Sequence, residues 1–241
     1  MARELIPNVL CIFAASKHDP VPSKIEKFAA FNSFPNCSFL PFEKINEGHP
    51  LKGKWRTEQF KNNNPIVLEL GCGRGEYTIG LAKNHPEKNF IGVDIKGNRI
   101  WTGAKEAIDK KMDNVAFIRT RIDFIEHCFS ENEVDEIWIT FPDPQPNKPS
   151  TRKRLTNPMF LNRYFKFLKP GGRIHLKTDN TGFYEYTLEV VAEEKHKLIW
   201  STPDLYHHNP SGQKELTEIQ TYYENLFSAK GEKIKYCCFE R

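Results

Sequence analysis

Long apolar runs are missing from this 241-residue chain. The longest run near its start, residues 9–15, spans seven residues, whereas a membrane-spanning helix needs about 20. Glu4 beside Arg3 also leaves the first residues without the basic start of a secretory signal peptide. We therefore expect a cytoplasmic protein in which residues 1–23 form a weakly structured leader.

Cysteine is sparse as well. The six cysteines form no CxxC pair and no dense disulfide framework, so reduced thiols are expected. The pairs His207–His208 and Cys237–Cys238 lack the spacing of a zinc site, and no metal is expected. The net charge of +4 is small, so a charged partner would have to be bound by a local cluster of charges.

The chain also lacks repeats, and its one clear change of pattern falls at residue 65. Residues 24–64 are rich in aromatic residues, Pro and Asn and show little periodicity, so we assign residues 1–64 to a leader and an arm. From residue 65 onward, apolar runs alternate with helix-like segments, which predicts an α/β fold with a doubly wound, mostly parallel sheet over residues 65–241. The expected strands are 65–70, 89–94, 114–120, 134–141, 171–179 and 233–240, and the expected helices are 75–85, 97–112, 121–130, 156–168 and 181–195. Because ligands collect at the carboxyl ends of parallel strands, functional residues should directly follow the strands.

The first strand end carries the glycine-rich segment LELGCGRGEY, residues 68–77. Gly71 and Gly73 allow a tight turn and the close approach of a ligand to the backbone. A dinucleotide-binding loop has a small residue at the third position of G-x-G-x-x-G, where this chain has Glu76. Together with Glu69, this acid favours a cationic ligand such as S-adenosylmethionine over a pyrophosphate. The alternative is a plain glycine-rich turn between a strand and a helix.

The next two strand ends extend this ligand site. Asp94 closes the second expected strand and can accept hydrogen bonds from both ribose hydroxyls of an adenosyl group, a device that NAD and S-adenosylmethionine sites share. After the third strand, Thr120, Arg121 and Ile122 are placed to contact adenine through their backbone atoms. The alternative for Asp94 is an acid in a surface turn.

The fourth strand end carries FPDPQPNKP, in which prolines surround a single acid, Asp143. Each proline fixes its φ angle near about −65°, which makes the segment stiff. The cations Arg152, Lys153 and Arg154 follow, and no other acid lies within residues 138–163. This placement favours a phosphate track beside the acid over an ordinary solvated surface. The alternative for FPDP is a rigid turn at the strand exit.

Taken together, these segments resemble the bacterial tRNA (guanine-N7-)-methyltransferases. The resemblance runs from about residue 28 to residue 241 and rests on LELGCGRGEY, FIGVD, FPDP with its basic run and KRL, GGRIHLKTDNTGFYEY and TYYE. It implies a Rossmann-like class I methyltransferase fold, S-adenosyl-L-methionine as cofactor, and methylation of N7 of guanine 46 in the variable loop of tRNA. The chain departs from the family at Gln145, where Trp is usual, and at Asn147, where Lys is usual and Lys148 is the neighbour.

The resemblance also implies roles for individual residues. Glu69 and Asp94 would bind the cofactor, with Gly71 and Gly73 in the loop and Arg121 beside the adenine. Asp143 would lie at the reacting centre, in contact with the cofactor and the guanine. The residues expected to hold tRNA are Asn147, Lys148, Arg152, Lys153, Arg154, Asp179, Thr221, Tyr223 and Glu224. The segment TYYE taken alone also fits core packing and a helix cap.

The expected chemistry gives Asp143 an electrostatic role. Guanine N7 has a lone pair and no proton, so its methylation needs no general base. The reaction makes the purine cationic, and a fixed carboxylate stabilises that charge. Positioning of the two reactants would supply the larger share of the rate. Beside an unstacked guanine, an aromatic ring of TYYE could stack while Glu224 accepts hydrogen bonds from the Watson–Crick edge.

Three other functions stay open from the residues alone. An exocyclic-amine methyltransferase would use the segment [DN]-P-P-[YF], whereas Pro144 and Gln145 follow the acid here. A nicotinamide-dependent oxidoreductase is disfavoured by Glu69 and Glu76. A tRNA-binding protein that keeps the fold without catalysis is distinguished only by an assay of methyl transfer.

Overall fold

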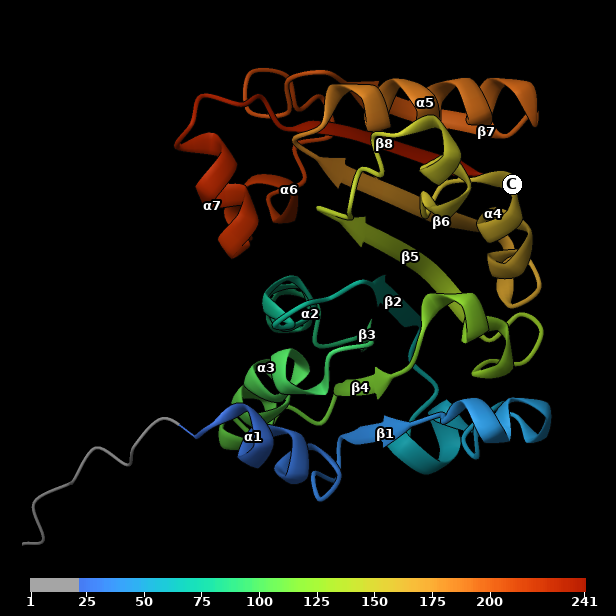
Figure 1. The fold of residues 1–241 in the computed structure, drawn as a ribbon, viewed down its shortest axis with the longest axis vertical. Coiled ribbons are helices and arrows are strands. Elements are labelled where there is room, and N and C mark those ends of the chain that lie inside the picture. The colour runs from blue at the N-terminus through green and yellow to red at the C-terminus, as the bar shows by residue number, and fades with distance from the viewer. Residues whose placement is uncertain (1–21) are drawn as a thin grey trace, which may run out of the picture.

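The computed structural model describes residues 22–241, which contain one eight-stranded sheet (Figure 1). The strands lie in the order β1-β4-β3-β2-β5-β6-β8-β7, from the bottom of the figure to the top. Neighbouring strands from β1 to β6 are parallel, and β8 is antiparallel to both β6 and β7. This confirms the predicted doubly wound, mostly parallel sheet. The bounds are β1 Cys37–Phe39, β2 Ile66–Leu70, β3 Asn89–Asp94, β4 Val115–Arg119, β5 Val134–Thr140, β6 Leu168–Thr178, β7 Lys197–Thr202 and β8 Lys235–Glu240.

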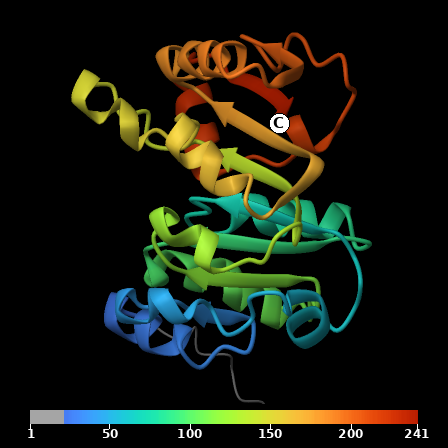
Figure 2. The same cartoon turned by 90° about the vertical axis from the view of Figure 1, so that its right-hand side faces the viewer.

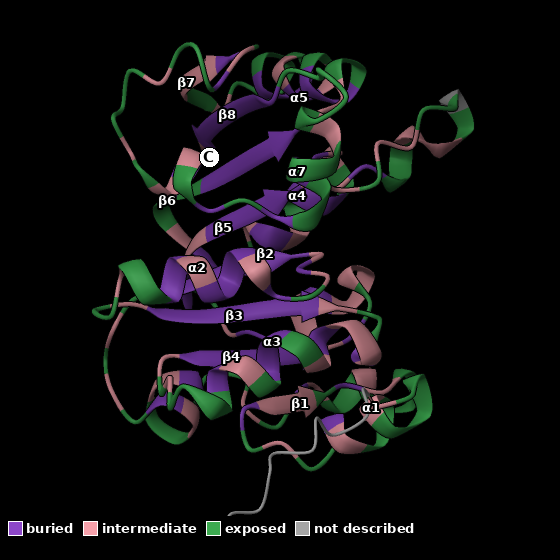
Figure 3. Cartoon of the chain, turned by 90° about the vertical axis from the view of Figure 1, so that its left-hand side faces the viewer, coloured by how far each residue is buried: buried purple, intermediate pink, exposed green. Residues whose placement is uncertain are grey.

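The central strands are mostly apolar because helices cover both faces of the sheet. In β5, Ile137 and Ile139 pack into one hydrophobic core and Trp138, between them, packs into the other. The first core includes side chains of α4 and α5, and the second includes side chains of α2 and α3. Figure 3 shows the central strands buried while the helices expose their outer sides. The helix bounds are α2 Glu76–Asn84, α3 Gly97–Asp109, α4 Pro158–Tyr164 and α5 Thr181–Glu193.

The predicted helices at 75–85, 97–112, 156–168 and 181–195 are all present, although α4 is shorter because β6 already begins at Leu168. The predicted helix at 121–130 is wrong. Its residues form the short 3₁₀-helix η3, Ile122–His127, with the backbone N–H of Phe124 bonded to Arg121 O and that of Cys128 bonded to Ile125 O. These bonds span three residues and close the tighter turn of a 3₁₀-helix.

The arm before residue 65 adds an edge to the sheet. Strand β1 pairs with β4, and α1 (Lys24–Phe31) packs against α3. The 3₁₀-helix η1 (Phe42–Glu47) and the π-helix η2 (Trp55–Phe60) complete the arm. Trp55 is fully buried, and its Nε1 donates a hydrogen bond to Cys128 O at 2.9 Å. The division of the chain at residue 64 stays a prediction, and residues 1–21 of the predicted leader lie outside the described residues.

The chain after α5 passes through β7, α6 (Glu215–Glu218), α7 (Tyr222–Ser228) and β8. Strand β8 lies between β6 and β7, so the last strand in sequence is not at the edge of the sheet. Within residues 22–241, no helix has both the length and the apolar character needed to cross a membrane. The five cysteines in this range have free thiols.

Candidate active site

A cleft of about 840 Å³ lies at the carboxyl ends of the parallel strands, and we call it the main cleft. The glycine-rich loop after β2 and Asp94 at the end of β3 line one side. Residues 141–145 after β5, Asp179 after β6 and the start of α7 line the other. The sheet therefore brings together residues that are far apart in the sequence, as the rule for parallel sheets predicts.

The glycine loop turns sharply and leaves open space beside its backbone. Gly71, Gly73 and Gly75 all have positive φ angles, which side chains rarely adopt. A Cβ atom on Gly71 or Gly73 would have no atom within 4 Å, so this side of the loop is open to a ligand. A Cβ atom on Gly75 would lie 2.8 Å from the ring of Phe117, so the third glycine allows close packing of the loop on β4.

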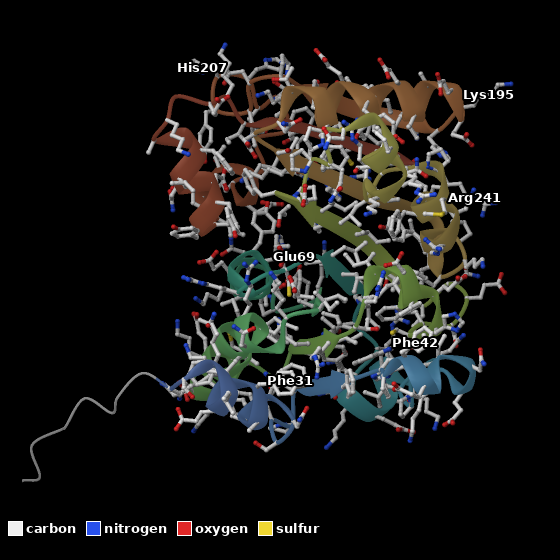
Figure 4. All side chains as sticks on the ribbon, in the orientation of Figure 1. Phe31, Phe42, Glu69, Lys195, His207 and Arg241 are labelled. Atoms are coloured by element: carbon white, nitrogen blue, oxygen red, sulfur yellow. The ribbon has the colours of Figure 1, made fainter. Side chains whose placement is uncertain are left out.

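Glu69 is a buried acid at the floor of the main cleft, with 3% of its surface exposed. Figure 4 shows it near the middle of the molecule. Its Oε2 accepts hydrogen bonds from the backbone N–H and the hydroxyl of Thr78, and its Oε1 accepts one from Thr140 Oγ1 at 2.6 Å. Burial raises the pKa of Glu69 to about 7, since the three hydrogen bonds offset only part of the cost of removing the charge from water.

Asp94 fastens the glycine loop to the end of β3. Its Oδ2 accepts a hydrogen bond from the backbone N–H of Gly73 at 3.0 Å, and its Oδ1 accepts one from the backbone N–H of Lys96 at 2.8 Å. A carboxylate has about four lone-pair sites, so these two bonds leave capacity for hydroxyl donors. The carboxylate lines the main cleft and also a second cavity beside it.

The second cavity, which we call the side cleft, has a volume of about 610 Å³. Its wall combines the segment 120–123 after β4 with Leu155, Met159 and Phe160. Arg121 lines this cavity and forms an ion pair with Asp123 at 3.1 Å. Because Gly71, Asp94 and Ile122 line both cavities, the side cleft opens beside the glycine loop.

Asp143 stands on a tightly constrained loop. Phe141 and Gln145, two residues before and two after it, both have left-handed backbone angles, with φ of 47° and 46°. Its Oδ1 accepts a hydrogen bond from the backbone N–H of Gln145 at 3.0 Å, which closes an Asx-type turn. Left-handed angles cost about 1–3 kcal/mol each in residues other than glycine, and such strain concentrates at functional sites. The whole segment 141–145 lines the main cleft, so this acid is exposed at its wall.

Comparison with known proteins agrees with this geometry. Residues 63–237 match the model of a family described as "Putative methyltransferase". A tRNA (guanine-N(7)-)-methyltransferase of Christiangramia forsetii is 49% identical over 219 residues, which cover 90% of this chain and 97% of that protein. One of Porphyromonas gingivalis is 50% identical over 210 residues, 86% of this chain and 85% of that protein.

The chain belongs to the tRNA (guanine-N(7)-)-methyltransferase family. Its fold is that of the class I Rossmann-like methyltransferases. The crystal structure of the 16S rRNA methyltransferase KamB, for example, matches 78% of this chain and 94% of its own, with a TM-score of 0.58 at 15% identity. S-adenosylmethionine is therefore the methyl donor. The residues present fit it, because the loop is open at Gly71 and Gly73 and the carboxyl groups of Glu69, Glu76 and Asp94 line the cleft beside it.

For this tRNA methyltransferase, most of the predicted site residues line one of the two clefts. They are Glu69, Gly71, Gly73, Asp94, Asp143, Lys153, Asp179, Thr221 and Tyr223 in the main cleft, and Arg121 and Arg152 in the side cleft. Asn147 is exposed at the start of the 3₁₀-helix η4 (Lys148–Lys153), away from both walls, and the side chain of Lys148 lies outside the described part of the chain.

The basic run is divided by the fold. Arg152 and Lys153 are exposed at the end of η4, which projects from the body of the molecule as the yellow segment in Figure 2. Arg154 is only 8% exposed, donates a hydrogen bond to Pro144 O at 3.0 Å, and lies over the ring of Tyr186 at 4.5 Å. Arg154 thus holds the acid-bearing loop against α5. Arg152 and Lys153, by contrast, form no ion pair with any residue in 22–241.

The TYYE segment is divided in the same way. Thr221 caps α7 by accepting a hydrogen bond from Glu224 N, and Tyr223 lines the main cleft. Glu224 has no exposed surface, so its carboxylate does not reach the cleft in this structure. Tyr222, which sequence reasoning missed, also lines the cleft and lies against Arg74 of the glycine loop at 5.4 Å. The helical period of α7 would have placed Tyr222 and Glu224 on different sides, had the start of the helix been predicted.

Proposed function

We propose that this methyltransferase acts on guanine 46 in the variable loop of tRNA and that the main cleft holds the reacting guanine beside the methyl donor. The observation that carries the proposal is the placement of Asp143 and Tyr223 in the same cleft as the glycine loop and Asp94. Donor and acceptor sites on one cavity are what a direct methyl transfer requires, since the reacting atoms must meet at about 3–3.5 Å.

The cofactor half of the proposal assigns Asp94 to the ribose hydroxyls and the open side of Gly71 and Gly73 to the amino-acid end. The segment 120–122, including Arg121, would face the adenine, and its position on the side cleft supports this. Glu69 would contribute negative charge beneath the cationic donor. The donor supplies an electrophilic methyl group on sulfur. The residues of the chain would bind and orient the two reactants and stabilise the charge that develops on the guanine.

The acceptor half assigns Asp143 to the guanine. Its exposed carboxylate would face the purine as positive charge develops there, and the left-handed residues on both sides would hold it in place. Tyr223 would stack on the unstacked base, and Asp179 would accept hydrogen bonds from it. Burial raises the pKa of Asp179, so that carboxyl group is only partly hydrated before the base arrives.

The tRNA backbone would lie along η4. Arg152 and Lys153 at the end of this projecting segment are the cations best placed for phosphate, with Asn147 and Lys148 at its start. Arg154 is left out of the phosphate contacts because its guanidinium is already bonded inside the protein.

The test is methylation of an unmodified tRNA transcript, with mass spectrometry of the nucleosides after digestion. We expect 7-methylguanosine in a transcript with guanine at position 46 and none in a matched transcript with adenine there. N2-methylguanosine in place of the 7-methyl isomer would show an exocyclic-amine enzyme. Equal 7-methylation of both transcripts would show that the position is wrong while the reaction is right.

A further inference from the structure

One arginine of the side cleft lacks the partners that a buried cation needs. Arg163, in the last turn of α4, lines this cleft and has 22% of its side chain exposed. Its Nη1 is buried and has no hydrogen-bond partner among residues 22–241. Its Nε lies 3.8 Å from Glu126 Oε1, which is longer than a hydrogen bond, and Lys166 already bonds the other oxygen of that carboxylate. A charged group without hydrogen bonds is costly to bury, and a ligand in the cleft would supply them.

The two clefts differ in the sign of their charge. The charged residues that line the side cleft are four cations and two acids, with a formal net charge of +2: Arg121, Arg152, Lys153, Arg163, Asp94 and Asp123. The main cleft is lined by four cations and five acids, with a formal net charge of −1. The side cleft therefore favours an anionic ligand, whereas the main cleft favours the cationic methyl donor.

Of the two reactants, only the tRNA can bring an anion to the side cleft. S-adenosylmethionine has one carboxylate, at the amino-acid end assigned to Gly71 and Gly73, and its adenosine has no acidic group. The tRNA carries a phosphate at every nucleotide. Arg152 lines the side cleft, and Lys153 and Leu155 line both clefts, so a strand bound along η4 would pass from one cleft to the other.

We propose that Arg163 binds a phosphate of the tRNA in the side cleft, close to the guanine in the main cleft. The ring of Phe160 supports the guanidinium from one side, with its centre 5.1 Å from the guanidinium carbon. Rotation about the side-chain bonds of Arg163 would bring Nη1 to the phosphate, where the planar guanidinium can form two parallel hydrogen bonds. The inference rests on the proposed acceptor site, and it extends the phosphate contacts from η4 to α4.

The first test is filter binding of an unmodified tRNA transcript across a salt series. Arg163→Gln removes one phosphate contact, so we expect the slope of log affinity against log salt to flatten by about 0.7–0.9 and the affinity at low salt to fall roughly 10–100-fold. Lys166→Gln is the matched control and should change neither quantity, because Lys166 shares Glu126 with Arg163 but lines neither cleft. An unchanged slope for Arg163→Gln would overturn the inference. If calorimetry then showed weaker binding of S-adenosylmethionine, Arg163 would contact the adenine instead.

The second test asks whether the partner of Arg163 is a phosphate. Single neutral methylphosphonate linkages are placed one at a time around position 46 of a ligated tRNA. One of them should weaken binding to the wild type and cause no further loss in Arg163→Gln, because both changes remove the same contact. Losses that add at every linkage would contradict the inference.

A second variant keeps the inference testable if Arg163→Gln fails to fold. Arg163→Lys retains the charge and loses the planar fork, so we expect an unchanged salt slope and about three- to tenfold weaker tRNA binding. Unchanged binding by Arg163→Lys would contradict the inference. Since these are binding measurements, they are separate from the methylation assay: wild-type protein that binds tRNA and forms no 7-methylguanosine would show that the proposed function is wrong.

Discussion

The carboxylate of Glu76 accepts a hydrogen bond from the backbone N–H of Tyr222, 146 residues later in the chain, at 2.9 Å. Glu76 is the first residue of α2, directly after the glycine loop, and Tyr222 is the first residue of α7. The bond therefore joins the cofactor loop to the helix that lines the acceptor side. It also gives a structural reason for an acid at the position where a dinucleotide-binding loop has a small residue.

This bond is expected to hold the cofactor loop and the acceptor side of the cleft in a fixed relative position. Glu76→Ala should leave α7 less firmly held and lower kcat about tenfold through looser positioning, with little change in cofactor affinity. Glu76→Gln keeps an oxygen acceptor and serves as the matched control, which should stay within about threefold of wild type. Single-turnover methylation at saturating tRNA, beside calorimetry of cofactor binding, gives both quantities. Equal losses in the two variants would point to the charge of Glu76 rather than to its bond with Tyr222.

Asp143→Asn keeps the size of the side chain and one hydrogen-bonding oxygen but removes the charge. We expect the rate of methyl transfer to fall about 10²–10³-fold, the effect of removing one preorganised electrostatic group. Asp109→Asn on the exposed face of α3 is the control and should have no effect. A single-turnover rate near that of wild type would reduce Asp143 to the Asx-type turn it forms with Gln145.

The basic run should separate into two functions. Neutralising Arg152 and Lys153 together is expected to flatten the slope of log tRNA affinity against log salt by about 1.4–1.8, at roughly 0.7–0.9 per phosphate contact. Arg154→Gln should leave that slope unchanged and lower kcat instead, since Arg154 holds the Pro144 carbonyl. Filter binding of tRNA across a salt series measures the slope. If Arg154→Gln flattened the slope as much as each of the changes at Arg152 and Lys153, Arg154 would also contact phosphate.

The raised pKa of Glu69, about 7 against an ordinary 4.5, predicts a proton-linked cofactor site. A cationic sulfonium favours the ionised carboxylate, so binding of S-adenosylmethionine should release a proton below pH 7, and affinity should rise with pH between about 5 and 7 by at most about tenfold per pH unit. Calorimetry in buffers of different ionisation enthalpy counts the protons. S-adenosylhomocysteine lacks the sulfonium charge and is the matched control, with a flatter pH dependence expected.

The same shift fixes the sign of the effect on stability without cofactor. A carboxyl group with a raised folded-state pKa stabilises the fold fully below its unfolded pKa of 4.5, and this contribution is lost as the pH rises through about 7. Glu69→Gln should therefore flatten the pH dependence of unfolding in that range. A steeper loss of stability toward low pH in the wild type than in Glu69→Gln would contradict the assignment.

Sequence patterns predicted the parts of the fold that follow from burial on two faces. The runs that became β2 to β5 are mostly apolar because both sides of the sheet are covered, and their ends located Glu69, Asp94 and Asp143. Strands β1 and β7 were not predicted, since β1 has three residues and both lie at the edges of the sheet, where burial imposes less pattern.

Side-chain burial was the part that sequence could not supply. Arg154 and Glu224 look like surface charges in the sequence, because the groups that neutralise or bond them, the Pro144 carbonyl and Lys177, meet them only in the folded chain. The amino-acid sequence does not distinguish a buried ion pair from two charged residues that are exposed to solvent. The contacts of these residues therefore had to come from the structure.

The position of β8 has a consequence for synthesis of the protein on the ribosome. Residues 66–94, with Glu69, the glycine loop and Asp94, form adjacent parallel strands and can assemble early. The acceptor side must wait for residues 235–240, since β8 lies between β6 and β7 and Lys235 Nζ bonds the carbonyl of Asp179 at 2.6 Å. We therefore expect a nascent chain to pass through a stage in which β2 and β3 can pair while β6 still lacks its partner β8.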